Sequence, residues 1–149
     1  MKIRKFSEGD ARKLSYLIRK TLIEVNRRDY PKSVIDNLIR NNSPKKIIER
    51  AKQRDIYVVV DGEKILATAN LGDNVIYTVF VNPKYHGKGI GRTLITYLEE
   101  KARKKGHKTI HVPSSITAYD FYKKLGYKKV RTKTSPEHGK VIIMKKKIQ

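Results

Sequence analysis

The chain has no cysteine and no tryptophan, and only 14 acidic residues stand against 35 basic ones. Without cysteine it can form no disulfide, no zinc site with thiolate ligands and no thiol nucleophile, which fits a reducing cytoplasm. No apolar run is long enough to span a membrane, and the basic start MKIRKF leads into polar residues instead of the apolar core of a signal peptide. These absences predict a soluble, cytoplasmic protein without a membrane partner.

The length of 149 residues suits one domain, residues 1–149, which can bury roughly two-thirds of the surface of the unfolded chain. Hydrophobic periodicity, turn residues and capping residues define its elements, and no repeat or linker interrupts them. The pattern predicts a strand at 2–6, helices beginning near Ser7, Ser33 and Ser43, a strand meander at 56–60, 64–71 and 75–81, a helix at 90–102, a strand at 109–112, a helix at 114–126, and strands at 128–133 and 140–146.

Three glycines at alternate positions join the third meander strand to the following helix. Gly87, Gly89 and Gly91 come after Asn82 and Pro83, which end the strand, so the helix begins within the glycine run. The first amides of a helix have no internal partners and carry partial positive charge, and glycine lets an anion approach them closely. Lys88 and Arg92 add positive charge, so the segment is typical of a pyrophosphate site.

Two common nucleotide loops are excluded by spacing. The triphosphate loop needs Ser or Thr after its lysine, but Gly89 follows Lys88, and the dinucleotide fingerprint fails because Arg92 stands where its third glycine belongs. The run HGKGIG at 86–91 instead resembles the acetyl-CoA loop of the GCN5-related N-acetyltransferase (GNAT) superfamily, which follows a strand ending in Val-x-Pro, here VNP. That family has Gln or Arg where this chain has His86, whose role the sequence does not explain.

The segment VPSSITAYDFYKKLGYKKV at 112–130 resembles the family's second motif. A Ser114 or Ser115 cap, apolar residues at helical spacing and Gly126 at the end predict a helix of about three turns. In the family, the tyrosine matching Tyr122 often protonates the departing thiolate, although a core aromatic with a surface hydroxyl is the alternative. Ser115 stands where many members have an Asn, so it is either a CoA contact or simply the helix cap.

The resemblance implies an α/β (α+β) fold with a mixed central sheet of six to seven strands, in which an antiparallel meander is followed by a splayed parallel pair and helices cover both faces. It implies acetyl-CoA as co-substrate, with direct acetyl transfer to a primary amine and no covalent enzyme intermediate. Backbone groups of Val79, Phe80 and Val81 would pair with the pantetheine arm. The residues expected to hold the pyrophosphate are Gly87, Lys88, Gly89, Ile90, Gly91 and Arg92.

The general base is less evident from the sequence. Glu24 lies near the end of the first helix, in the region that lines the acceptor pocket of relatives, but an exposed helix charge explains it equally. His111 could titrate near neutrality, and strand alternation leaves open which way it faces. The remaining histidines have no partners at metal-ligand spacing, so no metal site is expected.

The formal charge of +21 and the pI of about 10.2 need their own explanation. One interpretation is a surface for nucleic acid or ribosomes, with the fold retained and little or no catalysis. Others are steering of the polyanion CoA, or the lysine-rich composition common in thermophile proteins. Such a field disfavours polycationic acceptors. The acceptor itself and the choice between monomer and homodimer stay open.

Overall fold

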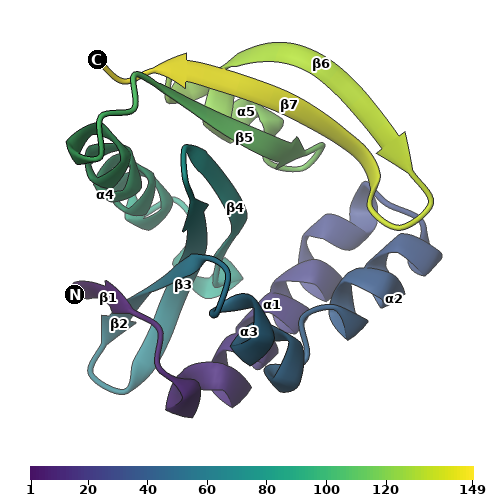
Figure 1. The fold of residues 1–149 in the computed structure, drawn as a ribbon. Coiled ribbons are helices and arrows are strands. Elements are labelled where there is room, and N and C mark those ends of the chain that lie inside the picture. Colours follow the sequence, from purple (N-terminus) through teal and green to yellow (C-terminus); the bar gives the residue numbers. More distant parts are fainter.

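The computed structural model describes all residues from Met1 to Gln149. Seven strands form one sheet in the order β1-β2-β3-β4-β5-β7-β6, and five α-helices flank it (Figure 1). The elements are β1 (Lys2–Lys5), α1 (Ala11–Glu24), α2 (Lys32–Arg40), α3 (Pro44–Arg50), β2 (Asp55–Asp61), β3 (Lys64–Gly72), β4 (Val75–Val81), α4 (Ile90–Lys104), β5 (Thr109–Ser115), α5 (Tyr119–Lys124), β6 (Lys128–Ser135) and β7 (Gly139–Lys147). Both the mixed α/β sheet and its seven strands match the prediction. None of the helices is both long and apolar enough to cross a membrane.

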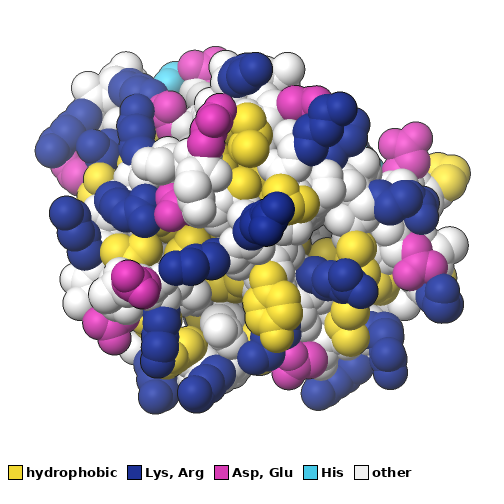
Figure 2. Space-filling model, turned by 90° about the horizontal axis from the view of Figure 1, so that it is seen from below, with side chains coloured by type: hydrophobic (Ala, Val, Ile, Leu, Met, Phe, Trp, Pro, Cys, Tyr) yellow, Lys and Arg dark blue, Asp and Glu magenta, His cyan; other side chains and the backbone are white.

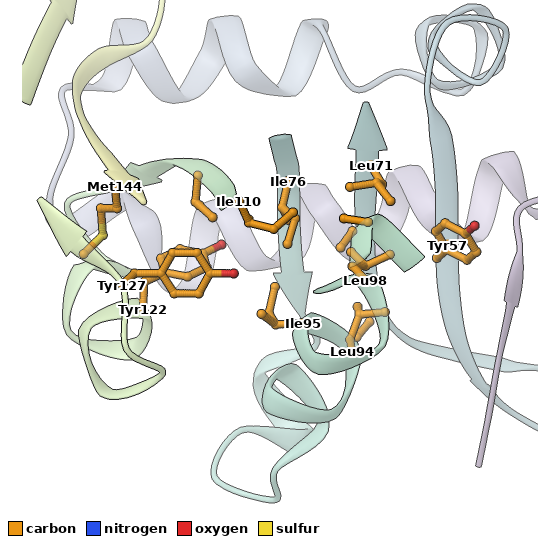
Figure 3. Close-up of a cluster of buried hydrophobic side chains, with 14 of the residues drawn as sticks. Tyr57, Leu71, Ile76, Leu94, Ile95, Leu98, Ile110, Tyr122, Tyr127 and Met144 are labelled. Atoms are coloured by element: carbon orange, nitrogen blue, oxygen red, sulfur yellow. The ribbon is translucent and has the colours of Figure 1, made fainter. Parts of the chain in front are cut away.

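Two hydrophobic cores lie on opposite faces of the sheet, because the strands of the meander are buried on both sides. In β2, Val58 belongs to the core beneath α1, α2 and α3, whereas Tyr57 and Val59 belong to the core beneath α4 and α5. This alternation follows from the two-residue period of a strand. Figure 3 shows part of the second core, in which Leu94 and Leu98 of α4 pack near the sheet.

The sheet splits between β4 and β5. The two strands run parallel and share one paired position, Val75 with His111. Asn74 holds this end together: its carbonyl accepts from the amide of His111 at 2.9 Å, and its Nδ2 donates to the carbonyl of Thr109 at 3.1 Å. β5 pairs with β7 along its whole length. Beyond the Val75–His111 pair, the edge of β4 that faces β5 has no strand partner. The splayed parallel pair is therefore present as expected.

The helix predicted over 114–126 is wrong in its first half. β5 continues through Ser115, because Ser114 and Ser115 pair with Ile142 and Val141 of β7, and α5 spans only Tyr119–Lys124. The serine hydroxyl still caps the turn, since Ser115 Oγ accepts from the amide of Ala118 at 3.1 Å. Pairing with β7 outweighs the local capping signal, because the capping residues carry no information about strand partners that lie 26 and 28 residues downstream.

Candidate active site

The glycine loop forms an open helix N-terminus at the end of β4. Gly87 and Gly89 have φ angles of 77° and 79°, in the left-handed region that favours glycine. Gly89 is the N-cap of α4, and no side chain caps this helix. The first amides of α4, those of Ile90, Gly91 and Arg92, therefore have no intrahelical partners and are available to an anion.

The structure requires glycine at position 91 for a different physical reason than at positions 87 and 89. It is buried, and a Cβ built there would lie 3.0 Å from Phe121 Cζ and 3.4 Å from Val81 Cγ2. The missing side chain lets α5 and the end of β4 approach the first turn of α4. The third glycine thus serves the packing that brings the two sequence motifs together.

His86 fastens the loop to the strand that precedes it. Its Nε2 lies 2.7 Å from the backbone oxygen of Val81, the last residue of β4. Because a carbonyl only accepts hydrogen bonds, Nε2 must carry the proton and donate. The imidazole at the position where the family has Gln or Arg therefore links the strand end to the turn before Gly87.

The three β4 residues expected to contact the pantetheine arm lie along the unpaired edge. Phe80 and Val81 pair with Thr68 and Ala67 of β3, and no strand pairs with them on the β5 side. Thr78 just before them has a φ of 52°, at the position where the register of β3 and β4 shifts. This β-bulge turns the strand and leaves backbone groups of the exposed edge without a ladder partner.

Tyr122 is both a core aromatic and a cavity residue. Its ring is 3% exposed and lies between the rings of Phe121 and Tyr127, at centroid distances of 5.1 and 5.7 Å. Figure 3 shows the Tyr122 and Tyr127 rings side by side near Met144. Burial raises the pKa of Tyr122 above its ordinary value, with no hydrogen-bonding group opposing it. The phenol thus stays protonated at neutral pH and can act as a donor.

A cavity of about 1060 Å³ opens beside the split in the sheet. One wall is the bulged part of β4, Tyr77–Phe80, and another is Ser115 with Tyr122. The remaining walls come from the end of α1, the α2–α3 segment and the β6–β7 hairpin. Residues from segments far apart in the chain therefore border one space.

Tyr30 closes this cavity by joining three distant segments. Its hydroxyl donates to the carbonyl of Lys140 at 2.7 Å and accepts from the amide of Ile116 at 2.8 Å. A Cβ at Gly139 would lie 2.8 Å from the Tyr30 ring, so the hairpin can approach only because that residue is glycine. Thr117 Oγ1 donates to Asp29 at 2.7 Å beside it. These contacts fix the C-terminal hairpin against the α1–α2 connection.

A family model described as an acetyltransferase (GNAT) domain matches residues 23–148. The chain belongs to the GNAT acetyltransferase family. An uncharacterized N-acetyltransferase of Methanocaldococcus jannaschii is 36% identical over 55 residues, covering 35% of this chain and 24% of the relative. Glucosamine 6-phosphate N-acetyltransferase of Trypanosoma brucei brucei is 42% identical over 53 residues, 36% of each chain. The chain thus matches well under half of the length of these relatives.

Solved GNAT structures share the fold over nearly the whole chain. A GCN5-related N-acetyltransferase from Rhodopseudomonas palustris superposes with a TM-score of 0.91 at 22% identity, covering 98% of this chain and 94% of that one. The PaiA N-acetyltransferase of Thermoplasma acidophilum, solved with coenzyme A, gives 0.83 at 24% identity and covers 98% of both chains. At this identity the likeness establishes the GNAT fold alone.

The predicted catalytic residue Glu24 and the histidine His111 do not line the cavity. Glu24 is exposed on α1 and lies outside the cavity wall. From this part of the chain, Leu22 and Asn26 line the cavity instead. The wall contains a single carboxylate, Glu49 of α3, and a single imidazole, that of His138. His111 is outside the wall as well. No cluster of His, Asp or Glu could hold a metal ion.

Arg50 and Arg54 were not identified from the sequence as candidate functional residues. Both line the cavity, together with Lys46 one turn earlier. Arg50 is the last residue of α3, and Arg54 lies in the turn that follows, where its amide donates to the Arg50 carbonyl at 3.0 Å. The available signal was their four-residue spacing, which places two residues on one face where a helical turn continues. A chain with 35 basic residues hides such a pattern, because surface lysines and arginines recur at helical spacing by chance.

Proposed function

We propose that the protein is an acetyl-CoA-dependent N-acetyltransferase that transfers the acetyl group directly to a primary amine of a small molecule or protein. The observation that carries the proposal is the shared cavity: the unpaired edge of β4 and the buried phenol of Tyr122 border the same space. The glycine loop lies at the end of that strand. The coenzyme A complex of the T. acidophilum relative supports this choice of donor.

The chain's own groups fit the parts of acetyl-CoA. The free amides of Ile90, Gly91 and Arg92, with the exposed side chains of Lys88 and Arg92, suit a pyrophosphate. The β4 edge around Val79–Val81 offers backbone hydrogen-bonding groups to an amide-containing arm. Ser115 already uses its hydroxyl to accept from Ala118, which leaves its O–H as a donor toward the cavity.

In the proposed reaction, the amine nitrogen attacks the acetyl carbonyl and the carbon–sulfur bond breaks. Tyr122 donates its proton as the thiolate departs, and the proton lost by the amine goes to a base or to water. A lysine-like amine is neutral in only about one part in a thousand at pH 7, so deprotonation is demanding. We propose Glu49 as the acceptor-side carboxylate in place of Glu24, because only Glu49 lies in the cavity wall.

The nucleic-acid alternative gains no support from the charge on the face shown in Figure 2. On the face shown in Figure 2, Lys and Arg are spread over the whole surface with Asp and Glu between them, instead of forming one stripe. Basic residues are dense on β6, where Lys128, Lys129, Arg131 and Lys133 are exposed. β6 is an edge strand, and charged side chains protect such edges from pairing with other chains.

Titration calorimetry with acetyl-CoA tests the proposal, followed by mass spectrometry of an amine panel incubated with acetyl-CoA. We expect saturable 1:1 binding and CoA release with at least one amine. Absence of binding heat at low micromolar protein would overturn the proposal. Salt-sensitive binding of RNA or DNA without CoA release would instead favour the basic binding module.

A further inference from the structure

Arg50 and Arg54 form a pair of half-buried cations in the acceptor part of the cavity. Both belong to its wall, and neither has a carboxylate within ion-pair distance. Charged groups withdrawn from water are ordinarily paired, because desolvation of an isolated charge is costly. Two neighbouring unpaired guanidinium groups therefore need an explanation.

Arg50 is held in place by neutral partners. Nη1 donates to Asn42 Oδ1 at 2.8 Å, and Nη2 donates to the carbonyl of Asn41 at 2.7 Å. Asn42 is itself buried and donates to the carbonyl of Leu38. A guanidinium has five N–H groups, so most of those of Arg50 remain available after these two bonds.

Arg54 is held by stacking instead of hydrogen bonding. Its Cζ lies 3.7 Å from the centroid of the Tyr77 ring, a cation–π contact that fixes the plane of the guanidinium. Stacking leaves the N–H groups at the edge of that plane free to bind an oxyanion in a bidentate manner. Tyr77 immediately precedes the Thr78 bulge, so Arg54 lies beside the strand along which the acetyl group is expected.

The electrostatics of this pair favour an anion. Burial lowers the pKa of Arg50, and the nearby charge of Arg54 lowers it further, so the two cations repel each other. Lys46 adds a third positive charge one turn earlier, and Glu49 is the one acidic residue in the wall. A bound phosphate or carboxylate would relieve this repulsion and use donors that are already oriented.

We infer that the acceptor is an anionic amine, in which a phosphate or carboxylate group binds Arg50 and Arg54 while the amino group faces Glu49 and the β4 edge. This inference rests on the proposed function and names the substrate class of the same cavity. The two positions also explain the expected rejection of polycationic acceptors such as polyamines, because such a molecule would bring positive charge against Lys46, Arg50 and Arg54.

Direct anion binding can be tested without turnover. We would saturate the protein with CoA, so that the glycine loop is occupied, and follow the arginine Nε–Hε resonances during titration with inorganic phosphate, succinate or chloride. We expect saturable shifts at Arg50 and Arg54 with phosphate or succinate, and none with chloride at equal ionic strength. The comparison of phosphate with succinate tells which oxyanion the pair prefers. Equal shifts with all three salts, or none, would overturn the inference.

Matched acceptors test the same inference in catalysis. Two pairs of acceptors each differ by one anionic group: glucosamine 6-phosphate with glucosamine, and serine with serinamide. Spermidine is the polycationic acceptor for comparison. In Arg54→Gln we expect the KM for the better anionic acceptor to be at least tenfold higher than in the wild-type protein. We expect kcat, and the KM for the matching neutral acceptor, to stay within twofold of the wild-type values. Arg19→Gln is the matched control, because Arg19 is exposed on α1, outside the cavity wall.

The possible failures are distinguishable. If the wild-type protein does not bind acetyl-CoA, the proposed function is refuted. The titration of the arginine resonances, carried out without CoA, would then still test whether Arg50 and Arg54 bind an anion. Equal turnover of anionic, neutral and cationic acceptors, or equal effects of Arg54→Gln on all of them, would refute the substrate class and leave the acetyltransferase intact. If no amine in the panel is acetylated, the titration decides.

Discussion

The proposed donor side and the proposed acceptor side of the candidate site are built in different ways. The proposed donor side comprises β4, the glycine loop at 86–92 and α5, and it offers backbone amides, a free strand edge and one phenol; the loop lies at the end of β4, outside the cavity wall. The acceptor side comprises the α1–α2 connection, α3 and the β6–β7 hairpin, and it uses side chains brought together from distant segments. Tyr30, for example, bonds to Ile116 and Lys140, 86 and 110 residues away.

This difference explains why the donor can be named more readily than the acceptor. Backbone groups bind any anion of the right shape, so their local requirement is glycine at fixed spacing, which a contiguous motif records. Side chains on separate elements can change one at a time without disturbing the fold. GNAT proteins named for very different substrates, an amino sugar phosphate and aminoglycosides among them, share the fold or part of the sequence with this chain.

The largest effect is expected from filling the glycine loop. In Gly89→Val, a branched side chain at a φ of 79° strains the N-cap and blocks the approach to the α4 amides. We expect acetyl-CoA binding to weaken by about a hundredfold or more in calorimetry. Gly106→Ala is the control, because Gly106 has a φ of 92° beyond the opposite end of α4. Equal loss of affinity in both variants would point to general destabilisation.

Much of the fold follows from the sequence because its signals are local. Turn residues at Gly62 and Asp73 separate the meander strands, and the stripe from Ile90 to Ala102 becomes the buried face of α4. The error at α5 has the opposite cause. Ser114 is 1% exposed in a strand that pairs with β7, and a partner so far along the chain leaves no trace in the local pattern.

The candidate site divides in the same way. The loop residues lie at the start of α4 and Tyr122 lies in the cavity wall, and their roles stay predictions; Gly91 packs against Phe121. Glu24 was chosen by its place in the chain and lies outside the cavity wall, whereas Glu49 and the arginine pair lie within it. Which charged residues face a cavity depends on how α3 packs, and the sequence does not specify this.

The second largest effect concerns the phenol on the donor side. Tyr122→Phe should reduce kcat by about a hundredfold, because general acid catalysis contributes on that order, with little change in acetyl-CoA affinity. Since burial holds the pKa of Tyr122 above its ordinary value, the wild-type rate should show no loss of this acid between pH 6 and 9. Single-turnover kinetics across this range provides the measurement.

Tyr127→Phe is the matched control for that variant. Tyr127 packs beside Tyr122, but its hydroxyl donates to Glu99 at 2.7 Å, and Lys146 lies 3.1 Å from the same carboxylate. Removal of this hydroxyl should lower the free energy of unfolding by about 2 kcal/mol, because it bonds a buried carboxylate, and should leave kcat within twofold. An unchanged kcat in Tyr122→Phe would remove Tyr122 from the acid role.

An intermediate effect is expected from the acceptor-side carboxylate. Glu49→Gln keeps the size of the side chain and removes its charge, so kcat/KM should fall by about tenfold at pH 7, with a smaller loss at pH 9, where more of the amine is already neutral. Glu24→Gln is the direct comparison. A larger loss in Glu24→Gln would restore the sequence-based choice and show that the cavity wall does not identify the base.

The smallest effect is expected at His86, where the chain departs from the family's usual residue. The bond from Nε2 to the Val81 carbonyl is short but exposed, so its loss in His86→Ala should cost about 1 kcal/mol, or about fivefold in acetyl-CoA affinity if the loop must be reordered on binding. His86→Gln should retain most of the affinity, because a glutamine amide can donate to the same carbonyl. Calorimetry of the two variants distinguishes a positioning role of His86 from a direct contact with the ligand. Equal weakening of acetyl-CoA binding in both variants would mean that the imidazole itself contacts the ligand. Wild-type affinity in His86→Ala would mean that the loop keeps its conformation without this hydrogen bond.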